Sequence, residues 1–218
     1  MHRSGTSCLA GSLEQQGLFL GEVNTAAPWN KRGNRESFRM MDLQAAILEA
    51  SGGSWDKPPE TVEWQPEHFE EARRILGENA GRPSWGFKDP RTLLTLGGWC
   101  RLVPDIQPVG IFRHPLKVAQ SLNRRNQLDL RAGLELWSTY NERLIRLHSE
   151  EPFPIVSFDE TPDTLNAKLH RAGELIGLSG TPDGEPFFAE ELRTSPATGE
   201  ALPPEVVSLY DELRRLAL

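Results

Sequence analysis

Two short polar motifs carry residue types that could together bind a phosphate or sulfate group. The first stands near the start of the chain and consists of Arg3, Ser4, Gly5, Thr6 and Ser7. The second consists of Arg113, at the end of an apolar run, and Ser121 farther along. Arginine supplies a fixed positive charge and hydroxyls supply neutral donors, so each motif could form one half of an anion site.

Gly5 makes the first motif suitable for close approach to an anion. Without a Cβ, the backbone can turn tightly and come near a ligand. The amides of Gly5, Thr6 and Ser7 would then be free donors at a helix N-terminus, where the helix dipole favours negative charge. The alternative is a surface helix that is simply capped by Ser4 or Thr6. The motif is not a Walker A loop, because no lysine follows the glycine.

The second motif places two polar side chains where they could flank one anion. Arg113 follows the apolar run Val109–Phe112, and the helix expected from Leu116 onward brings Ser121 to the same face. Ligands of open parallel sheets bind at the carboxyl ends of the strands, so we expect Arg113 to bind a phosphate. The alternatives are a surface ion pair for Arg113 and a solvent-facing hydroxyl for Ser121.

Short apolar stretches alternate with helical patterns along the chain, which is typical of an α/β fold with a parallel sheet. We expect extended segments over Leu18–Leu20, Trp85–Phe87, Val109–Phe112 and Pro154–Phe158. We expect helices over residues 7–16, 36–50, 66 to 77 or 81, 116 onward, 128–148, 162–176 and 204–218. The strand at Trp85–Phe87 would deliver Lys88, Asp89, Pro90 and Arg91 at its carboxyl end.

The length of the chain, 218 residues, predicts one domain over residues 1–218, because single α/β domains commonly reach this size. Only Met1 and His2 precede Arg3, whereas a phosphate loop of this kind normally follows a buried strand. We therefore expect that the first strand of the sheet has been lost, through a late start codon or trimming of the chain.

Composition argues against several kinds of partner. The net charge of −7 disfavours a general nucleic-acid surface, which usually carries a basic excess. No stretch approaches the roughly 18 apolar residues of a membrane span, and the N-terminus has no signal-peptide pattern. Cys8 and Cys100 stand in apolar helical contexts, and we interpret them as reduced core thiols of a cytoplasmic protein.

Histidines and carboxylates form no cluster with metal-ligand spacing, so we expect no metal site. We interpret His114 as a structural part of the turn at Arg113-His114-Pro115. We interpret His68, His148 and His170 as surface residues.

In their order along the chain, these motifs resemble those of the sulfotransferases. The resemblance rests on residues 3–7, on Lys88-Asp89-Pro90-Arg91 and on residues 113–121, and it extends through Ile155–Phe158 and the following helix. It is to the bacterial sulfotransferases and, at Lys-Asp-Pro, to the tyrosylprotein sulfotransferases. It implies a P-loop-like, three-layer α/β domain, with helices on both sides of a central parallel sheet. It also implies 3′-phosphoadenosine-5′-phosphosulfate (PAPS) as the co-substrate.

The resemblance also implies a role for each motif in sulfuryl transfer. The residues from Arg3 to Ser7 would surround the 5′-phosphosulfate, and Arg113 with Ser121 would hold the 3′-phosphate. Lys88 would assist at the transferring group, with Arg3 beside it, because a compact ammonium suits the charge that develops on the leaving oxygen.

A general base must also take the proton of an acceptor hydroxyl. Residues 30–36 resemble the Asn…Gly…Glu element of many bacterial members, although Arg35 stands where an aromatic residue is usual. Glu36 is therefore the first choice of base and Glu22 the second. The alternative for Glu36 is a first-turn acid that complements a helix dipole. Arg91 could either shape the pocket or pair with Asp89.

The sequence is also compatible with two other functions, and it does not identify the acceptor. The first is a P-loop nucleotide kinase, and the second is a non-catalytic nucleotide-binding relative. A small-molecule or carbohydrate acceptor could bind at the loop over residues 24–34 or near Trp55 and Trp64, where aromatic rings would suit a sugar. A homodimer is also left open.

Overall fold

The computed structural model describes residues 1–26, 32–180, 185–188 and 201–218. The chain forms two compact units. The first comprises residues 1–16 and 108–218, and the second comprises residues 17–107. The second unit is thus one continuous segment, whereas the first is assembled from two.

The first unit contains a two-stranded parallel sheet. β1 (Gly110–Phe112) and β2 (Ile155–Ser157) pair in the register Gly110 with Ile155, Ile111 with Val156 and Phe112 with Ser157. Every residue of both strands is buried, as expected for parallel strands that are covered on both faces. One further backbone bond, from the amide of Phe158 to the carbonyl of Phe112 at 2.8 Å, continues the pairing into the turn after β2.

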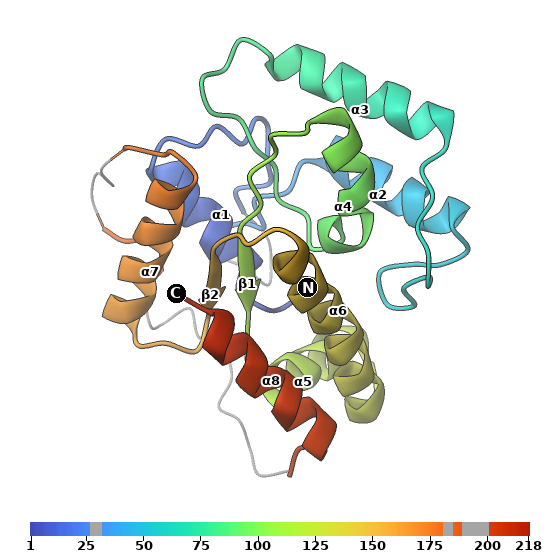
Figure 1. Cartoon of the computed structure of the whole chain (residues 1–218), viewed down its shortest axis with the longest axis vertical. Coiled ribbons are helices and arrows are strands. Elements are labelled where there is room, and N and C mark those ends of the chain that lie inside the picture. Colours follow the sequence, from blue (N-terminus) through green and yellow to red (C-terminus); the bar gives the residue numbers. More distant parts are fainter. Residues whose placement is uncertain (27–31, 181–184, 189–200) are drawn as a thin grey trace. The chain divides into compact units, whose positions relative to one another are not determined.

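Helices surround this sheet (Figure 1). They are α1 (Thr6–Gln15), α5 (Pro115–Asn126), α6 (Leu130–Glu150), α7 (Pro162–Leu175) and α8 (Pro204–Leu216). α1 packs against α7, and α5 packs against α6. α5 and α6 approach each other closely at Gly133 of α6, because glycine has no Cβ. A Cβ added there would lie 3.0 Å from the Cβ of Ala119.

Local signals explain where several of these helices begin. A proline stands in the first turn of α5, α7 and α8, where its missing amide is not needed. Asp129 caps α6, since its carboxylate accepts from the amides of Arg131 and Ala132.

The second unit packs α2 (Phe38–Ala50), α3 (Pro66–Asn79) and α4 (Thr92–Leu102) around aromatic side chains. The aromatic rings in contact are those of Trp64, Phe69, Trp85, Phe87 and Trp99. Gly98 makes room for them, because a Cβ there would lie 2.1 Å from the indole of Trp64.

The structure confirms an α/β organisation, rich in helix and with a small parallel sheet. The expected strands near residues 109–112 and 154–158 are confirmed as β1 and β2. The strand expected over Trp85–Phe87 is wrong, because Trp85 forms only an isolated parallel bridge with Phe19. Only the Ser84 carbonyl and the Gly86 amide bond to Phe19, so no second rung extends the pairing.

Two side chains lie elsewhere than expected. Cys100 is exposed, so it is not a core thiol, whereas Cys8 is buried. His68 is 6% exposed rather than a surface residue. Its Nδ1 accepts from the amide of Gln65 and thereby caps α3. No helix in the described part of the chain combines the length and apolar character needed to cross a bilayer.

Candidate functional site

The loop before α1 has the backbone form expected of an anion-binding turn. Gly5 is the N-cap of α1 and has a φ of 92°, in the left-handed region that favours glycine. Arg3 also has a positive φ, of 64°. No side chain caps the helix, so capping by Ser4 or Thr6 is not what the structure shows. The first-turn amides therefore stand at a helix N-terminus without a side-chain cap, an arrangement that suits an anion.

Phe158, which follows β2, lies directly against this turn. A Cβ added to Gly5 would lie 2.4 Å from Cδ2 of the Phe158 ring. The turn therefore requires glycine for space as well as for its backbone angle. Within the same loop, Ser4 is 1% exposed, and its Oγ has no hydrogen-bond partner in the described part of the chain. A buried hydroxyl of this kind can bond to a ligand without losing another partner.

A hydrogen bond joins the two polar motifs. Nε of Arg3 donates to Oγ of Ser121 at 2.8 Å. Ser121 lies in α5 and is 4% exposed, so its hydroxyl is not a solvent-facing group. Arg113 is also buried, at 5% exposure, which rules out a surface ion pair. The structure thus brings the first motif and Ser121 together within one unit, as the motifs predicted.

Arginine side chains concentrate positive charge around Arg3. Burial and then repulsion by other guanidinium groups lower the pKa of Arg3 to about 10, which leaves it charged at neutral pH. Those other groups belong to Arg125, Arg113 and Arg124. Because like charges this close disfavour one another, the cluster would be stabilised by an anion.

The spacing of Arg124 and Arg125 from Ser121 is a sequence signal for their place in this cluster. Both stand in the last turn of α5, three and four residues after Ser121, and side chains at these spacings share a helix face. Once Ser121 is taken as an anion ligand on a helix, that spacing identifies them as neighbours.

The peptide between Arg113 and His114 is held by two side chains that the sequence did not identify. The carbonyl of Arg113 accepts from Nε1 of Trp137 at 2.9 Å, and the amide of His114 donates to Oδ2 of Asp159 at 2.5 Å. Asp159 also pairs with Lys117 at 2.7 Å. His114 is the N-cap of α5, in keeping with a structural role. Burial lowers the pKa of its imidazole below the ordinary value.

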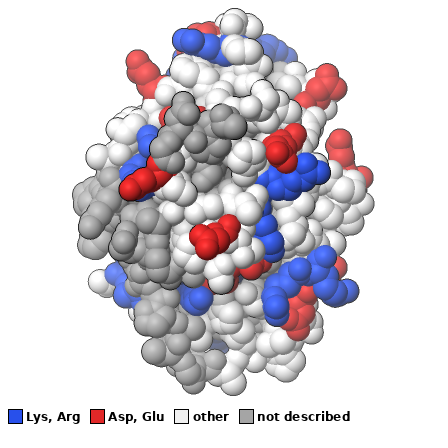
Figure 2. Space-filling view, turned by 90° about the vertical axis from the view of Figure 1, so that its left-hand side faces the viewer, with Lys and Arg blue, Asp and Glu red and all other residues white. Residues whose placement is uncertain are grey.

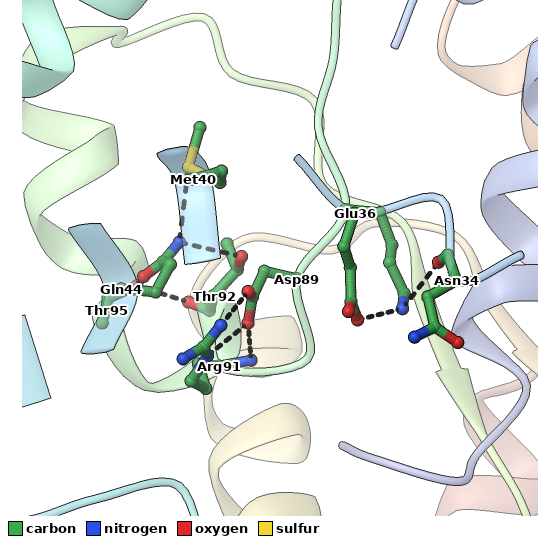
Figure 3. Close-up of polar contacts among 9 residues, drawn as sticks. Asn34, Glu36, Met40, Gln44, Asp89, Arg91, Thr92 and Thr95 are labelled. Atoms are coloured by element: carbon green, nitrogen blue, oxygen red, sulfur yellow. Dashed lines mark hydrogen bonds and ion pairs between the residues drawn. The ribbon is translucent and has the colours of Figure 1, made fainter. Parts of the chain in front are cut away.

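A separate polar cluster lies in the second unit (Figure 3). Nζ of Lys88 donates to Oε1 of Glu36 at 2.5 Å and to the carbonyl of Asn34 at 3.1 Å. Both charged side chains are only 11% exposed. Glu22, the second candidate for the base, is exposed. Of the two carboxylates, Glu36 is the one beside the lysine.

Backbone pairing with Asn24 positions Glu36. The amide of Asn24 donates to the carbonyl of Glu36, and the amide of Arg35 donates to the carbonyl of Asn24, both at 3.0 Å. Gly33 has a φ of 75°, and a Cβ there would lie 2.3 Å from the Asn24 oxygen. Asn30 and Lys31, which belong to the same sequence element, lie outside the described residues.

Asp89 and Arg91 form a pair of their own beside this cluster (Figure 3). Nε and Nη2 of Arg91 donate to the two carboxylate oxygens of Asp89 at 2.8 and 2.6 Å, and the Arg91 amide adds a third bond. Pairing with Asp89 was one of the two roles considered for Arg91. Lys88 and Asp89 are consecutive in the chain, yet their side chains bond to different partners, Glu36 and Arg91.

Other expectations concern the acceptor region and metals. Trp64 packs into the aromatic cluster and donates to the carbonyl of Thr95, which makes it a packing residue. Part of the loop over residues 24–34 lies outside the described residues. Across the described ranges, no group of three His, Cys, Asp or Glu residues could hold a metal ion. Figure 2 shows acidic and basic side chains interspersed on the face it presents.

Comparisons with protein-family models, with curated proteins and with solved structures find no match to this chain. The first unit offers glycine-turn amides, hydroxyls and guanidinium groups, which suit an anion such as a phosphate. The second offers a shielded ammonium and carboxylate, which suit charge stabilisation and proton transfer.

Proposed function

We propose that this protein is a sulfotransferase that moves a sulfuryl group from PAPS to a hydroxyl or amine of an acceptor. The observation that carries the proposal is the hydrogen bond between Arg3 and Ser121, which joins the two motifs of the anion site. The proposal includes the finer fold class that the motifs implied, a P-loop-like domain with three layers.

The residues of the first unit fit the donor chemically. The turn at Gly5 would bind the 5′-phosphosulfate, and the unpartnered hydroxyl of Ser4 is a donor available for it among the described residues. Arg113 and Ser121 would hold the 3′-phosphate. The mutual repulsion of the arginine side chains supports this assignment, because an anion would relieve it.

Transfer would proceed by in-line displacement. The bond from sulfur to the phosphate oxygen breaks as a bond from sulfur to the acceptor oxygen forms, and adenosine 3′,5′-bisphosphate leaves. Glu36 accepts the acceptor proton, and Lys88 stabilises the charge that develops on the leaving oxygen. The ion pair between them holds the proposed base and the proposed stabilising cation side by side.

A small-molecule or carbohydrate acceptor remains part of the proposal. Its hydroxyl would have to approach Glu36, so the residues next to the backbone pair of Asn24 and Glu36 are the ones to examine for acceptor contacts. The reaction as written requires no metal ion.

Calorimetric titration of the purified protein tests the donor site. We expect adenosine 3′,5′-bisphosphate to bind at least about tenfold more tightly than AMP, because its 3′-phosphate would gain charge-assisted hydrogen bonds. ATP should bind more weakly than the bisphosphate. Arg113→Ala should remove most of the preference over AMP, whereas the control Arg131→Ala, an exposed residue of α6, should keep it. Preference for ATP would instead favour a nucleotide kinase, and equal binding of AMP would contradict the proposed 3′-phosphate site.

A further inference from the structure

Both polar atoms of one peptide unit are engaged by side chains from other elements. The unit joins Arg113 to His114, between the end of β1 and the start of α5. Its oxygen accepts from Nε1 of Trp137 in α6 at 2.9 Å. Its N–H donates to Oδ2 of Asp159, after β2, at 2.5 Å. The two polar atoms of a peptide point in opposite directions, so bonds to both fix the orientation of its plane.

Asp159 also holds the first turn of α5. Its other oxygen, Oδ1, accepts from Nζ of Lys117 at 2.7 Å, and the two side chains are 14% and 24% exposed. The carboxylate therefore fixes the direction in which α5 leaves the strand. The same helix carries Ser121, whose hydroxyl accepts from Arg3. A shift of this peptide would change the positions of both Arg113 and Ser121.

Aromatic packing shields the bond from Trp137, which is buried, whereas the bond from the His114 amide to Asp159 is partly buried. Trp137 is fully buried, and the ring of Tyr210 in α8 lies edge-on to both Trp137 and His114. Hydrogen bonds in such surroundings are stronger than those exposed to solvent, and a partner left without its bond is costly. The guanidinium of Arg113 lies 5.2 Å from the centre of the Phe158 ring, which also contacts the turn at Gly5.

We propose that Trp137 and Asp159 form a clamp on the Arg113–His114 peptide and thereby position Arg113 to select a 3′-phosphorylated nucleotide. Both are positioning residues, since neither is placed against the ligand. The identity of the ligand rests on the proposed function, whereas the clamp itself does not.

A set of variants separates the parts of the clamp. Trp137→Phe removes the indole donor, and Asp159→Ala removes the acceptor. Asp159→Asn keeps an oxygen that can accept from the His114 amide but loses the charge. Lys117→Met removes only the ion pair. The matched control is Trp99→Phe, because Trp99 is also fully buried, yet its indole nitrogen has no partner within the described ranges.

The first readout is the backbone and arginine NMR spectrum of the ligand-free protein. The clamp predicts a protected His114 amide with a low-field shift, as a short bond to a carboxylate produces. In Asp159→Ala the amide should move upfield and exchange faster, and the Nε–Hε signal of Arg113 should shift or broaden. Trp99→Phe should leave both signals in place. Unchanged His114 and Arg113 signals in Asp159→Ala would overturn the inference, whatever the nucleotide results.

The second readout is the ratio of the dissociation constants for AMP and adenosine 3′,5′-bisphosphate, measured well below each variant's melting temperature. Trp137→Phe and Asp159→Ala should lower this ratio on the order of tenfold, by weakening the bisphosphate alone. Asp159→Asn should recover part of the loss, and Lys117→Met should lose less than Asp159→Ala. A residue with a merely structural role would lower the melting temperature and leave the ratio unchanged.

The two readouts distinguish a failure of the proposed function from a failure of the clamp. If the unaltered protein binds neither nucleotide, the proposed function fails, and the clamp is then judged by the His114 and Arg113 signals. If the bisphosphate binds and its preference over AMP survives in Asp159→Ala and Trp137→Phe, the positioning role is overturned while the proposed function stands.

Discussion

Gly5 combines two constraints that can be measured separately. Its φ of 92° is unfavourable for any other residue, and a Cβ would overlap the Phe158 ring. Gly17 has a similar φ, of 99°, but open space around the position of its Cβ. We expect Gly17→Ala to lower the free energy of unfolding by about 1–2 kcal/mol, from backbone strain alone. Gly5→Ala should cost about 1–3 kcal/mol more, because the ring must move. Urea unfolding of both variants measures the difference.

The overlap can also be relieved from the side of Phe158. Alanine lacks all the ring atoms that the added Cβ would meet, so Phe158→Ala should cost less free energy of unfolding in the Gly5→Ala background than in the unaltered protein. Equal losses from Gly5→Ala and Gly17→Ala, or additive effects of the two changes at the turn, would show that the ring is not the obstacle.

Residue types and order were enough to predict the turn at Gly5 and its proximity to Ser121, but not the side chains that support Arg113. Gly5, Arg113 and Ser121 could be selected because their chemistry is specific and the spacing suits one anion. Trp137 and Asp159 could not, because one looks like a core aromatic of an amphipathic helix and the other like an acid after a strand. Their roles depend on long-range contacts with a backbone peptide, which leave no local pattern.

At the scale of elements, the N-terminus of α5 should make stability depend on pH. Burial lowers the pKa of His114 below its ordinary 6.5, so the unfolded chain binds a proton more readily than the folded protein does. Its contribution to stability is therefore complete above about 6.5 and is lost as the pH falls from there through the lowered folded-state value. His114→Gln should remove this part of the acid sensitivity and keep the amide bond to Asp159.

We would measure the urea unfolding midpoints of the unaltered protein and of His114→Gln from mildly acidic to neutral pH. The difference between them should change as the pH falls below about 6.5 and level off at lower pH. His170→Gln, in which a partly exposed imidazole near Glu174 is removed, serves as the control. Parallel curves for His114→Gln and the unaltered protein would exclude His114 as a source of the acid sensitivity.

Helix boundaries were predictable where a local signal marks them. Pro115 and Pro162 begin α5 and α7 within a residue or so of the expected positions. α4 had no predicted bounds, because Gly97, Gly98 and two threonines give Thr92–Leu102 a weak helical preference. It is stabilised by tertiary packing of Trp64 against Gly98. The strand prediction at Trp85–Phe87 was wrong although the local pattern favoured a strand. The aromatic side chains of this segment join an aromatic cluster, and its backbone forms no ladder.

At the scale of the whole molecule, the two polar clusters belong to different units, and this division suggests a separation of functions. The proposed donor ligands, Arg3, Arg113 and Ser121, lie in the unit formed by residues 1–16 and 108–218. Lys88 and Glu36 lie in the unit of residues 17–107. The sequence predicted both sets of residues, although it contained no boundary signal that placed them in separate compact units.

We therefore expect substitutions in the two units to affect different measurements. Lys88→Ala should abolish sulfuryl transfer but weaken adenosine 3′,5′-bisphosphate binding less than Arg113→Ala does, because Lys88 would contact only the leaving oxygen of its 5′-phosphate. Arg113→Ala should weaken bisphosphate binding about tenfold or more. In the double variant, the two losses of binding free energy should add, as for independent sites. Calorimetry of the three variants, with a transfer assay on each, tests this expectation. Full turnover by Lys88→Ala would refute the proposed chemistry, whereas an equal loss of bisphosphate affinity in both single variants would contradict the smaller effect expected of Lys88.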